Sequence, residues 1–312
     1  MKRWRCVRLA YKLWAVLLYM PMCRAYARHI VGDKRADPLY RALCSLHFRW
    51  THGFWPSFTH PRRFTEKLWG RMLHDRNPQL TLLCDKLRVR EYVAQKAGTE
   101  CLISLLWSGT TPEEIPFDRL PERYVIKTNH GCANNIFVRD KFQLDMVETR
   151  RQLNEWLRFN YGDGFLIGIE WGYRHVKPAI IVEEYLEQDG QAPVDYKFYC
   201  FGGRVEFLTQ HFERFVEHKT RSFDRNYAPH EIHYQFEQYA GLCERPQNFE
   251  GMVQLAETLA QDFEFMRVDL YNIAGRILFG EMTPYPGGVS TRFLPESLDV
   301  VLGAKWKIKQ TV

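Results

Sequence analysis

Two carboxylates near the C-terminal end of the chain, Asp269 and Glu281, have a spacing that would suit metal chemistry. They lie in two apolar stretches, Met266–Leu270 and Arg276–Met282, and the connecting residues 272–275 predict a β-hairpin. Two like charges on one face of a hairpin repel each other unless something neutralises them. A hard divalent cation with phosphate oxygens would do so. The alternative is a solvated outer face, and the hairpin alone leaves both open.

The register of this hairpin depends on the form of its turn. If residues 273–275 make a three-residue loop with Gly275 in the left-handed conformation, residue 272 pairs with 276 and Asp269 with 279. The two carboxylates would then lie one diagonal step apart. Strand alternation gives a polar face that carries Arg267, Asp269, Glu281 and Thr283. It gives a core face that carries Met266, Val268, Leu270, Leu278 and Met282. On a solvated face, Arg267 would simply offset the two acids.

A lysine at position 127 ends an apolar run that begins at Tyr124 and predicts a strand. The small polar residues 128–131 follow it directly. Such a lysine before a glycine-containing loop is typical of a phosphate clamp. It is equally typical of an edge-strand lysine before a turn, so the local sequence leaves both interpretations open.

A second lysine, Lys197, lies among aromatic residues in the predicted strand Asp195–Phe201. Gly202 and Gly203 join this strand to Arg204–His211 and predict a second hairpin. Asp195 and Lys197 share one face of the strand by alternation. The alternative to a functional lysine is one that buries its aliphatic stem and extends its charged end to solvent.

Helical periodicity and one buried strand surround these positions. The predicted helices are Phe64–His74, Asp85–Ala97 with a stop at Gly98, Leu144–Phe159, and Phe249–Phe263. A buried strand is predicted at Ala179–Val182, and it runs into the acidic residues of 183–186. Beyond this strand, the two hairpins predict a mainly antiparallel region.

The composition limits the class of protein. Of the 312 residues, 46% are hydrophobic and 26% are charged, which is typical of a folded chain with real cores. Residues 1–30 hold seven lysines and arginines and no acid, so 36 basic residues face 37 acidic ones in the rest of the chain. The body of the protein therefore lacks the basic footprint that indicates nucleic-acid binding. Eight cysteines without a CxxC pair indicate reduced thiols, and no HExxH motif points to zinc.

The basic N-terminal segment has three interpretations. Its apolar run, Leu13–Cys23, is shorter than the roughly 20 residues that span a membrane, and it contains Pro21. A basic amphipathic helix that lies on a membrane or on the protein body fits this pattern. A signal peptide cleaved after Ala25-Tyr26-Ala27, or a plain buried helix, would fit as well.

Six blocks of the sequence carry a resemblance to a known family. In chain order they read "FTEKLWGRMLHDRNP", "CDKLRVREYVAQKAG", "LPERYVIKTNHG", "IIVEEYL", "DYKFYCFGGRV" and "FMRVDLYNIAGRILFGEMTPYPGG". With them, the chain from about His60 to Pro295 resembles the TupA-like ATP-grasp proteins of teichuronopeptide synthesis, a family of bacterial surface-polysaccharide synthesis. Six blocks in the right order are far more specific than any one of them, and no GxxxxGK[ST] motif occurs.

The resemblance implies an α+β fold of the ATP-grasp kind. Two α+β lobes would hold the nucleotide between them, and a helical region would precede them. The expected divisions are a basic segment over residues 1–33, a helical region over 34–120, an N-lobe over 121–186 and a C-lobe over 187–312.

The resemblance also implies roles for individual residues. Lys127 and Lys197 would bind the phosphates of ATP, and the loop covering them would contain His130, Gly131 and Asn134. The adenine hinge would be Glu183, Glu184, Tyr185 and Leu186, acting mostly through the backbone. Asp269 and Glu281 would bind Mg²⁺, with Thr283 offering a further oxygen where many ATP-grasp enzymes have asparagine. Arg267 and Arg292 would hold a carboxylate or an acylphosphate. The loop departs from the family pattern at Cys132 and Ala133, where relatives usually have glycine.

The implied activity is that of an ATP- and Mg²⁺-dependent ligase that joins a carboxylate to an amine through an acylphosphate. Its partners would be ATP, a carboxylate-bearing sugar or glycan and an amino compound, with no nucleic acid. We expect a cytoplasmic protein with peripheral contact to the inner membrane through residues 1–30. One alternative is a sugar-modifying transferase, either a glycosyltransferase or a kinase with Asp195 as base. The other is a degenerate ATP-grasp binding module, which the glycine-poor loop favours.

Overall fold

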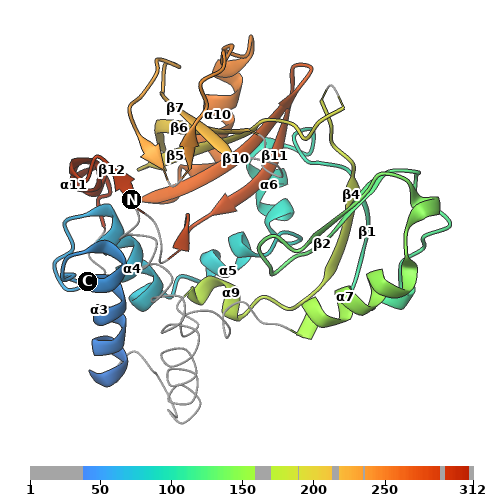
Figure 1. Ribbon diagram of the computed structural model, residues 1–312, viewed down its shortest axis with the longest axis horizontal. Coiled ribbons are helices and arrows are strands. Elements are labelled where there is room, and N and C mark those ends of the chain that lie inside the picture. The colour runs from blue at the N-terminus through green and yellow to red at the C-terminus, as the bar shows by residue number, and fades with distance from the viewer. Residues whose placement is uncertain are drawn as a thin grey trace, which may run out of the picture.

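The computed structural model describes residues 38–158, 170–188, 190–212, 218–234, 236–288 and 292–308 (Figure 1). The predicted basic segment over residues 1–33 lies outside the described residues. Within the described part of the chain, no helix is both long enough and apolar enough to cross a membrane. The described chain begins with helices and continues into two larger sheets and one short strand pair.

The helical region holds four helices. They are α3 (Pro38–His52), α4 (Phe64–His74), α5 (Pro78–Cys84) and α6 (Val89–Ala97). Helix α4 has its predicted bounds, and Phe64, Leu68 and Trp69 lie on its buried side. Its first turn is held by Glu66, whose carboxylate accepts hydrogen bonds from the backbone N–H groups of residues 57, 62 and 63.

Helix α6 is shorter than predicted at its start. The Asp85 carboxylate accepts hydrogen bonds from the backbone N–H groups of Leu87 and Arg88, which form a turn ahead of Val89. The predicted stop is confirmed, because Gly98 follows the helix with φ of 85°.

The smaller of the two large sheets has four antiparallel strands in the order β1-β4-β2-β3. Its strands are β1 (Leu105–Gly109), β2 (Tyr124–Thr128), β3 (Asn135–Val138) and β4 (Ile180–Glu184). One face packs on α7 (Met146–Arg158) through Leu153, Ile126 and Val182. The remaining elements nearby are η3 (Pro112–Glu114), η4 (Lys141–Gln143) and α9 (Trp171–Arg174). Because β1 pairs with β4, we propose that this lobe begins by residue 105 rather than at residue 121.

The larger sheet has six strands in the order β11-β10-β5-β6-β7-β9. They are β5 (Asp195–Phe201), β6 (Arg204–Phe212), β7 (Lys219–Asp224), β9 (Glu237–Gln238), β10 (Phe265–Ile273) and β11 (Arg276–Thr283). All pairs are antiparallel except β7 with β9. The separate pair is β8 (His233–Tyr234) with β12 (Phe293–Leu294), and the helices of this region are α10 (Phe249–Ala260) and α11 (Ser297–Lys305).

The two faces of the six-stranded sheet are unlike. One face packs on α10 and α6 through an apolar cluster that includes Phe198, Met266 and Val268. The other face is apolar at one end, where Phe201 and Phe265 pack against α4 and Trp306. At its other end this second face is polar, and it carries Lys197 and Asp269.

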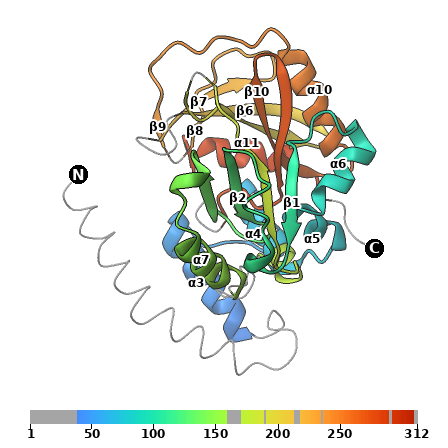
Figure 2. The same cartoon turned by 90° about the vertical axis from the view of Figure 1, so that its right-hand side faces the viewer.

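Figures 1 and 2 show how the two large sheets are arranged. In Figure 1 the six-stranded sheet lies at the upper left, the four-stranded sheet lies on the right, and α5, α6 and α9 lie between them. Figure 2 views the four-stranded sheet from its own side, with α10 above and α7 below. The chain is thus built as two sheet-containing lobes joined through short helices.

Candidate functional site

The β10–β11 hairpin places the two predicted metal carboxylates opposite each other. Its turn has two residues rather than the three expected, because Ala274 and Gly275 both have positive φ, 50° and 82°, and Ile273 pairs with Arg276. The register then shifts between Asp269 and Leu270. As a result Asp269 pairs directly with Glu281 instead of with residue 279.

The residue that allows this shift is Gly280. A Cβ at this position would lie 3.1 Å from the Asp269 carbonyl oxygen, so the close backbone approach favours glycine. The shift also corrects the expected core face. Phe279 pairs with Leu270 and joins the cluster under α10, whereas Leu278 pairs with Tyr271 and shares the side of the sheet that carries Asp269.

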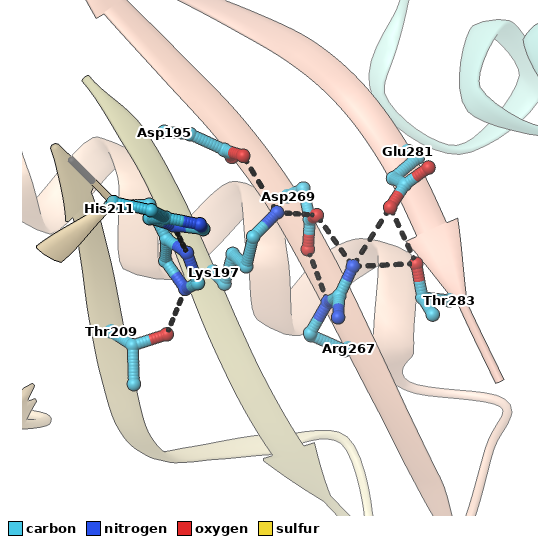
Figure 3. A network of polar contacts seen from close by, with 9 residues as sticks. Asp195, Lys197, Thr209, His211, Arg267, Asp269, Glu281 and Thr283 are labelled. Atoms are coloured by element: carbon cyan, nitrogen blue, oxygen red, sulfur yellow. Dashed lines mark hydrogen bonds and ion pairs between the residues drawn. The ribbon is translucent and has the colours of Figure 1, made fainter. Parts of the chain in front are cut away.

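Arg267 holds the two carboxylates in place (Figure 3). Its Nε donates to Asp269 Oδ1 at 2.7 Å, and its Nη2 donates to Asp269 Oδ2 and to Glu281 Oε1, both at 2.8 Å. The same Nη2 lies 3.1 Å from Thr283 Oγ1, which in turn donates to Glu281 Oε1 at 3.0 Å. Four side chains from two paired strands therefore form one charge-assisted network.

Lys197 joins this network from the next strand. It forms an ion pair with Asp269, and its Nζ lies 2.6 Å from Asp195 Oδ2. Asp195, Lys197 and Asp269 are all buried, but the Glu281 side chain keeps 35% of its surface exposed. The open edge of the network is therefore the Glu281 carboxylate.

The two carboxylates have different electrostatic surroundings. Burial would raise the pKa of Glu281, but Arg267, Lys86 and Lys197 outweigh burial and hold that pKa well below its usual range. Burial raises the pKa of Asp269, against the opposing effect of Arg267 and Lys197. A divalent cation beside both groups would favour their charged forms.

The polar face continues across the sheet behind Lys197. Thr209 lies opposite Lys197, and His211 lies opposite Asp195. Thr209 Oγ1 is 3.0 Å from His211 Nε2, and His211 Nδ1 is 2.8 Å from His218 Nε2 (Figure 3). Thr209 and His211 are buried, so His211 lies behind the charged network rather than at its open edge. Sequence analysis did not identify this pair of histidines, because neither lies in a recognisable motif.

On the four-stranded sheet, Lys127 faces an acidic partner. Lys127 Nζ lies 2.5 Å from Glu183 Oε2, and Arg90 Nη1 lies 3.4 Å from the other oxygen of the same carboxylate. Glu183 is buried, whereas the Lys127 side chain is 24% exposed. The Glu183 side chain therefore neutralises the lysine predicted to bind phosphate.

The other hinge residues direct their side chains to different partners. The Glu184 carboxylate accepts from Ser104 Oγ at 2.7 Å and lies 3.9 Å from Arg276. The Tyr185 hydroxyl accepts from Arg139 Nε at 3.2 Å, and Leu186 is half-buried. Glu184 and Tyr185 also line a hollow of about 390 Å³, but none of Lys127, Lys197, Asp269 and Glu281 lines it. That hollow is therefore separate from the charged network.

The loop after β2 is organised around a glycine. A Cβ at Gly131 would lie 2.5 Å from Asn134 Nδ2 and 2.9 Å from Thr128 Oγ1, so this position accepts no larger residue without a shift. Asn134 Nδ2 itself donates to Thr128 Oγ1 at 3.2 Å and closes the loop. Ala133 takes φ of 62°, a left-handed conformation that glycine adopts more readily.

His130 does not point out of this loop. It is buried, and its two ring nitrogens lie 3.1 Å from Asn129 Oδ1 and 3.2 Å from the Trp156 carbonyl oxygen. These contacts anchor the loop to the body of the lobe. His130 therefore positions the loop, and a direct role toward phosphate stays a prediction.

Comparison with protein-family models identifies the family of this chain. The family model described as TupA-like ATPgrasp matches residues 66–307, which includes both sheets. The chain belongs to the TupA-like ATP-grasp family. Its α+β fold is the ATP-grasp fold, as the resemblance implied.

Solved structures of other ATP-grasp proteins are similar to the chain at low identity. The D-alanine–D-alanine ligase of Bacillus anthracis in complex with ATP has 17% identity and a TM-score of 0.42, and the match covers 73% of this chain and 63% of that one. The phosphoribosylamine–glycine ligase of Thermotoga maritima has 14% identity and a TM-score of 0.43, with 77% and 66% covered. The chain thus spans less than two thirds of the length of either protein. A search of the curated proteins finds no match to the chain.

A lysine to which sequence analysis assigned no role lies close to the candidate site. Lys86 Nζ donates to the Gly131 carbonyl oxygen at 2.5 Å, and Lys86 is among the charges that lower the pKa of Glu281. It therefore lies between the glycine loop and the metal carboxylates. In the sequence, only its place beside Asp85 in the block that carries the family resemblance marked it out.

The carboxylate pair fits the Mg²⁺ that the fold implies. Glu281 is partly exposed and ionised. Asp269 Oδ1 accepts one hydrogen bond, from Arg267 Nε, and has a second lone pair, whereas Oδ2 already accepts from Arg267 Nη2 and Lys197 Nζ. No group of three or more histidine, cysteine or acidic residues suited to a metal occurs among the described residues. Phosphate oxygens and water would thus complete the shell, as is usual for Mg²⁺ on a nucleotide.

The other predicted arginine, Arg292, is not brought to the network. Its side chain is 43% exposed and lies 3.6 Å from Glu296, four residues along the chain. Of the predicted substrate-holding arginines, only Arg267 contacts the carboxylates.

Proposed function

We propose that this protein is an ATP- and Mg²⁺-dependent ligase that activates a carboxylate as an acylphosphate and joins it to an amine. The observation that carries the proposal is the direct pairing of Asp269 with Glu281 across β10 and β11, braced by Arg267 and next to Lys197. Bound Mg²⁺ would neutralise phosphate charge and orient the phosphates. The role of the protein is to hold these charges ready before reaction.

The nucleotide would lie across both sheets. Lys127 from β2, Lys86 from the turn before α6 and Lys197 from β5 would supply three positive charges for the phosphates. Residues 184–186 would contact adenine through the backbone, since the side chains of Glu184 and Tyr185 already bond to Ser104 and Arg139. Two buried apolar residues lie on the sides of the sheets that would face the nucleotide. Leu278 shares its side of the six-stranded sheet with Asp269, and Ile181 shares its side of the four-stranded sheet with Lys127. Both would pack against the adenine base.

Phosphate binding would replace one ion pair. Lys127 pairs with Glu183, which has a second cationic neighbour in Arg90. When Lys127 turns to a phosphate, Arg90 remains to neutralise Glu183. The exchange therefore leaves no buried carboxylate without a counter-charge.

The role of Asp195 argues against a sugar kinase. A kinase needs a carboxylate that can accept the proton of a sugar hydroxyl. Asp195 is buried and lies 2.6 Å from Lys197 Nζ, with which it forms an ion pair. A carboxylate held in this ion pair is poorly placed to accept a proton from a sugar hydroxyl. The acylphosphate route needs no such base for its first step.

A second candidate is a nucleotide-binding module without turnover. The observation in its favour is the phosphate loop, where Ala133 takes φ of 62° and Cys132 stands beside it in place of glycine. Side chains at these positions limit how closely a backbone can approach phosphate. Such a module would bind Mg-ATP and release no ADP.

The cellular role that we propose rests on the family. We infer that the carboxylate belongs to a uronic-acid sugar of a surface polysaccharide, and that the protein works in the cytoplasm beside the inner membrane. Residues 1–30, with seven basic residues and no acid, would contact anionic lipid headgroups. Fractionation of cells that express the full chain and a chain lacking residues 1–30 tests this contact. Equal recovery of both chains in the soluble fraction would contradict it.

The activity test uses Mg-ATP, a panel of uronic acids and hydroxylamine, which traps an acylphosphate as a hydroxamate. The proposal expects ADP, phosphate and hydroxamate in equal amounts with at least one acid. Asp269→Asn should abolish all three products. The matched control is Asp262→Asn, because Asp262 pairs with Lys96 at the surface and should be dispensable.

Other outcomes identify the alternatives. A phosphorylated sugar without hydroxamate would indicate a kinase, and preferential binding of a UDP-sugar would indicate a glycosyltransferase. Binding of Mg-ATP with no ADP release, for every acid, would leave the binding module as the better account.

A further inference from the structure

Glu170 is a third carboxylate near the charged network, and neither the family roles nor the network accounts for it. It directly precedes α9, and this helix is tied to the chain that follows Glu281. The Gly172 N–H donates to the Tyr285 hydroxyl at 3.1 Å. A Cβ at Gly172 would lie 2.8 Å from Cys84 Sγ, so the helix also packs closely on α5. Glu170 is therefore held in a fixed place.

A glycine accommodates the Glu170 carboxylate. Gly287 and Gly288, with φ of 66° and 52°, lie in the turn beyond β11. A Cβ at Gly288 would lie 2.5 Å from Glu170 Oε1. The carboxylate thus rests against bare backbone at the end of the stretch that begins with Glu281.

The charged neighbours of two thiols, Cys84 and Cys132, indicate where Glu170 lies relative to the site. Glu170 raises the pKa of Cys84 and of Cys132, and Glu281 and Lys86 act on the same two thiols, after the larger effect of burial. Cys132 belongs to the phosphate loop, and Arg267 also acts on it. The start of α9 therefore lies near both the phosphate loop and Glu281.

Glu170 differs from the other carboxylates there in its lack of a counter-charge. Asp195, Asp269 and Glu281 each pair with Lys197 or Arg267. Among the described residues, no lysine or arginine lies within ion-pair distance of Glu170. The ionisable groups that face it are Cys84 from α5, Cys132 from the loop and Tyr173 from α9, and none of them is cationic.

A carboxylate without a counter-charge in this position would bind a cationic group of a substrate. Burial raises the pKa of Glu170 to about 8. Near neutral pH it is therefore ready either to pair with a bound ammonium or to carry a proton.

We propose that Glu170 binds the ammonium group of the amine substrate and takes its proton, so that the free amine attacks the acylphosphate. The proposal rests on the ligase function proposed above and names the part of the site that receives the amine. It is drawn from the contact of Glu170 with the Gly288 backbone, the packing of α9 against Tyr285 and α5, and the lack of a cationic partner for Glu170 among the described residues.

The step balances as follows for an amine RNH₃⁺. The proton moves to the Glu170 carboxylate and leaves RNH₂, whose nitrogen lone pair attacks the carbonyl carbon of the acylphosphate. The C–N bond forms and the C–O bond to phosphate breaks. The second amine proton leaves with the phosphate, and Glu170 returns its proton to solvent.

The test is calorimetric titration of the protein saturated with Mg-ADP, using glycine, L-lysine, L-glutamate and ethanolamine as amine probes. At pH 7 Glu170 is largely protonated, so binding of an ammonium should release a proton and make the heat depend on the buffer. Glu170→Gln should bind Mg-ADP like the wild type. It should bind the amine about 10- to 100-fold more weakly and release no proton.

Two variants keep the test independent of folding. Unchanged Mg-ADP affinity shows that Glu170→Gln is folded. Gly288→Ala, whose Cβ would displace the carboxylate, should weaken amine binding in the same direction. Glu170→Asp should restore part of the proton release.

The possible failures are distinguishable. If the wild type binds Mg-ADP but none of these amines, or if Glu170→Gln binds an amine as tightly as the wild type, the role of Glu170 is overturned. If the wild type does not bind Mg-ADP at all, the ligase proposal itself fails, and this inference falls with it.

Discussion

The six-stranded and four-stranded sheets hold their charged residues differently. On the six-stranded sheet, Lys197, Arg267 and Asp269 are buried and bonded to one another through strands that are already paired. On the four-stranded sheet, Lys127 is partly exposed, and the loop beyond it carries exposed residues at 132 and 133.

This difference indicates how the work of binding is divided. Charges that act on the transferring phosphoryl group are most effective when they are fixed before the reaction, and a paired sheet fixes them. A loop that covers the phosphates must open and close, so it belongs in a region with fewer buried contacts. We therefore expect substitutions on the six-stranded sheet to change stability and activity together, and those on the four-stranded sheet to change mainly activity.

The largest effect is expected from Arg267→Met. It removes the group that bonds Asp269 and Glu281, so two facing carboxylates lose their shared counter-charge. Breaking a buried ion pair typically costs about 3–5 kcal/mol, and we expect a loss of that order in urea unfolding together with loss of turnover.

The control for this prediction is Arg225→Met. Arg225 pairs with Glu257 at the surface, where such pairs contribute about 0–1 kcal/mol. Equal destabilisation by the two substitutions would show that the network is not a special feature of the sheet.

Lys127→Met should separate activity from stability. We expect phosphate release to fall by about 10²–10³-fold, as when one fixed donor to the transition state is removed. The cost in stability should stay near 1–2 kcal/mol, because Arg90 continues to neutralise Glu183. Steady-state kinetics and urea unfolding of the same preparation check both parts. Lys96→Met, at a surface pair with Asp262, should change neither by much.

The β10–β11 hairpin shows what the sequence could and could not predict. Alternation placed Arg267, Asp269, Glu281 and Thr283 on one face, and the structure agrees. The predicted register was wrong, because the two-residue turn and the shift at Gly280 each displace the pairing by one residue in the same direction. A total displacement of two residues keeps Glu281 on the predicted face, so it leaves no mark in the hydrophobic pattern. A glycine within a strand was the available sign of a bulge.

Glu170 could not be found by pattern at all, and Lys86 was marked only by its place in the family-like block. The neighbours of Glu170 come from α5, from the loop after β2 and from the turn beyond β11, which only the fold brings together. The role expected for His130 shows the converse limit. Its position in the loop was predictable, but the direction of its side chain toward Trp156 was not.

Gly131→Ala should have an intermediate effect, confined to nucleotide binding. The added Cβ meets the side chains of Asn134 and Thr128, so the loop must shift. We expect KM for ATP to rise about tenfold with little change in stability. Gly70→Ala is the matched control, because a Cβ there meets nothing within 4 Å inside helix α4. It should raise the free energy of unfolding by about 0.5–1 kcal/mol and leave KM unchanged. Equal changes in KM for the two variants would contradict the assignment of this loop to the phosphates.

The smallest effect is expected from Arg292→Ala. This arginine makes only an exposed pair with Glu296, so its removal should change stability by no more than about 0.5 kcal/mol. Turnover should stay within about twofold of the wild type in the hydroxamate assay. A loss of tenfold or more would place Arg292 in the substrate site after all.

The central claim is that Asp269 and Glu281 hold the metal of a nucleotide that both sheets bind. The most direct measurement is calorimetric titration of ATP into the wild type and Glu281→Gln, each with Mg²⁺ and with EDTA. Glu281 suits this test because its side chain is partly exposed and glutamine preserves its shape. The account predicts that Mg²⁺ tightens ATP binding at least tenfold in the wild type and has little effect in the variant. ATP binding that is insensitive to Mg²⁺ in the wild type, or equally sensitive in both, would contradict it.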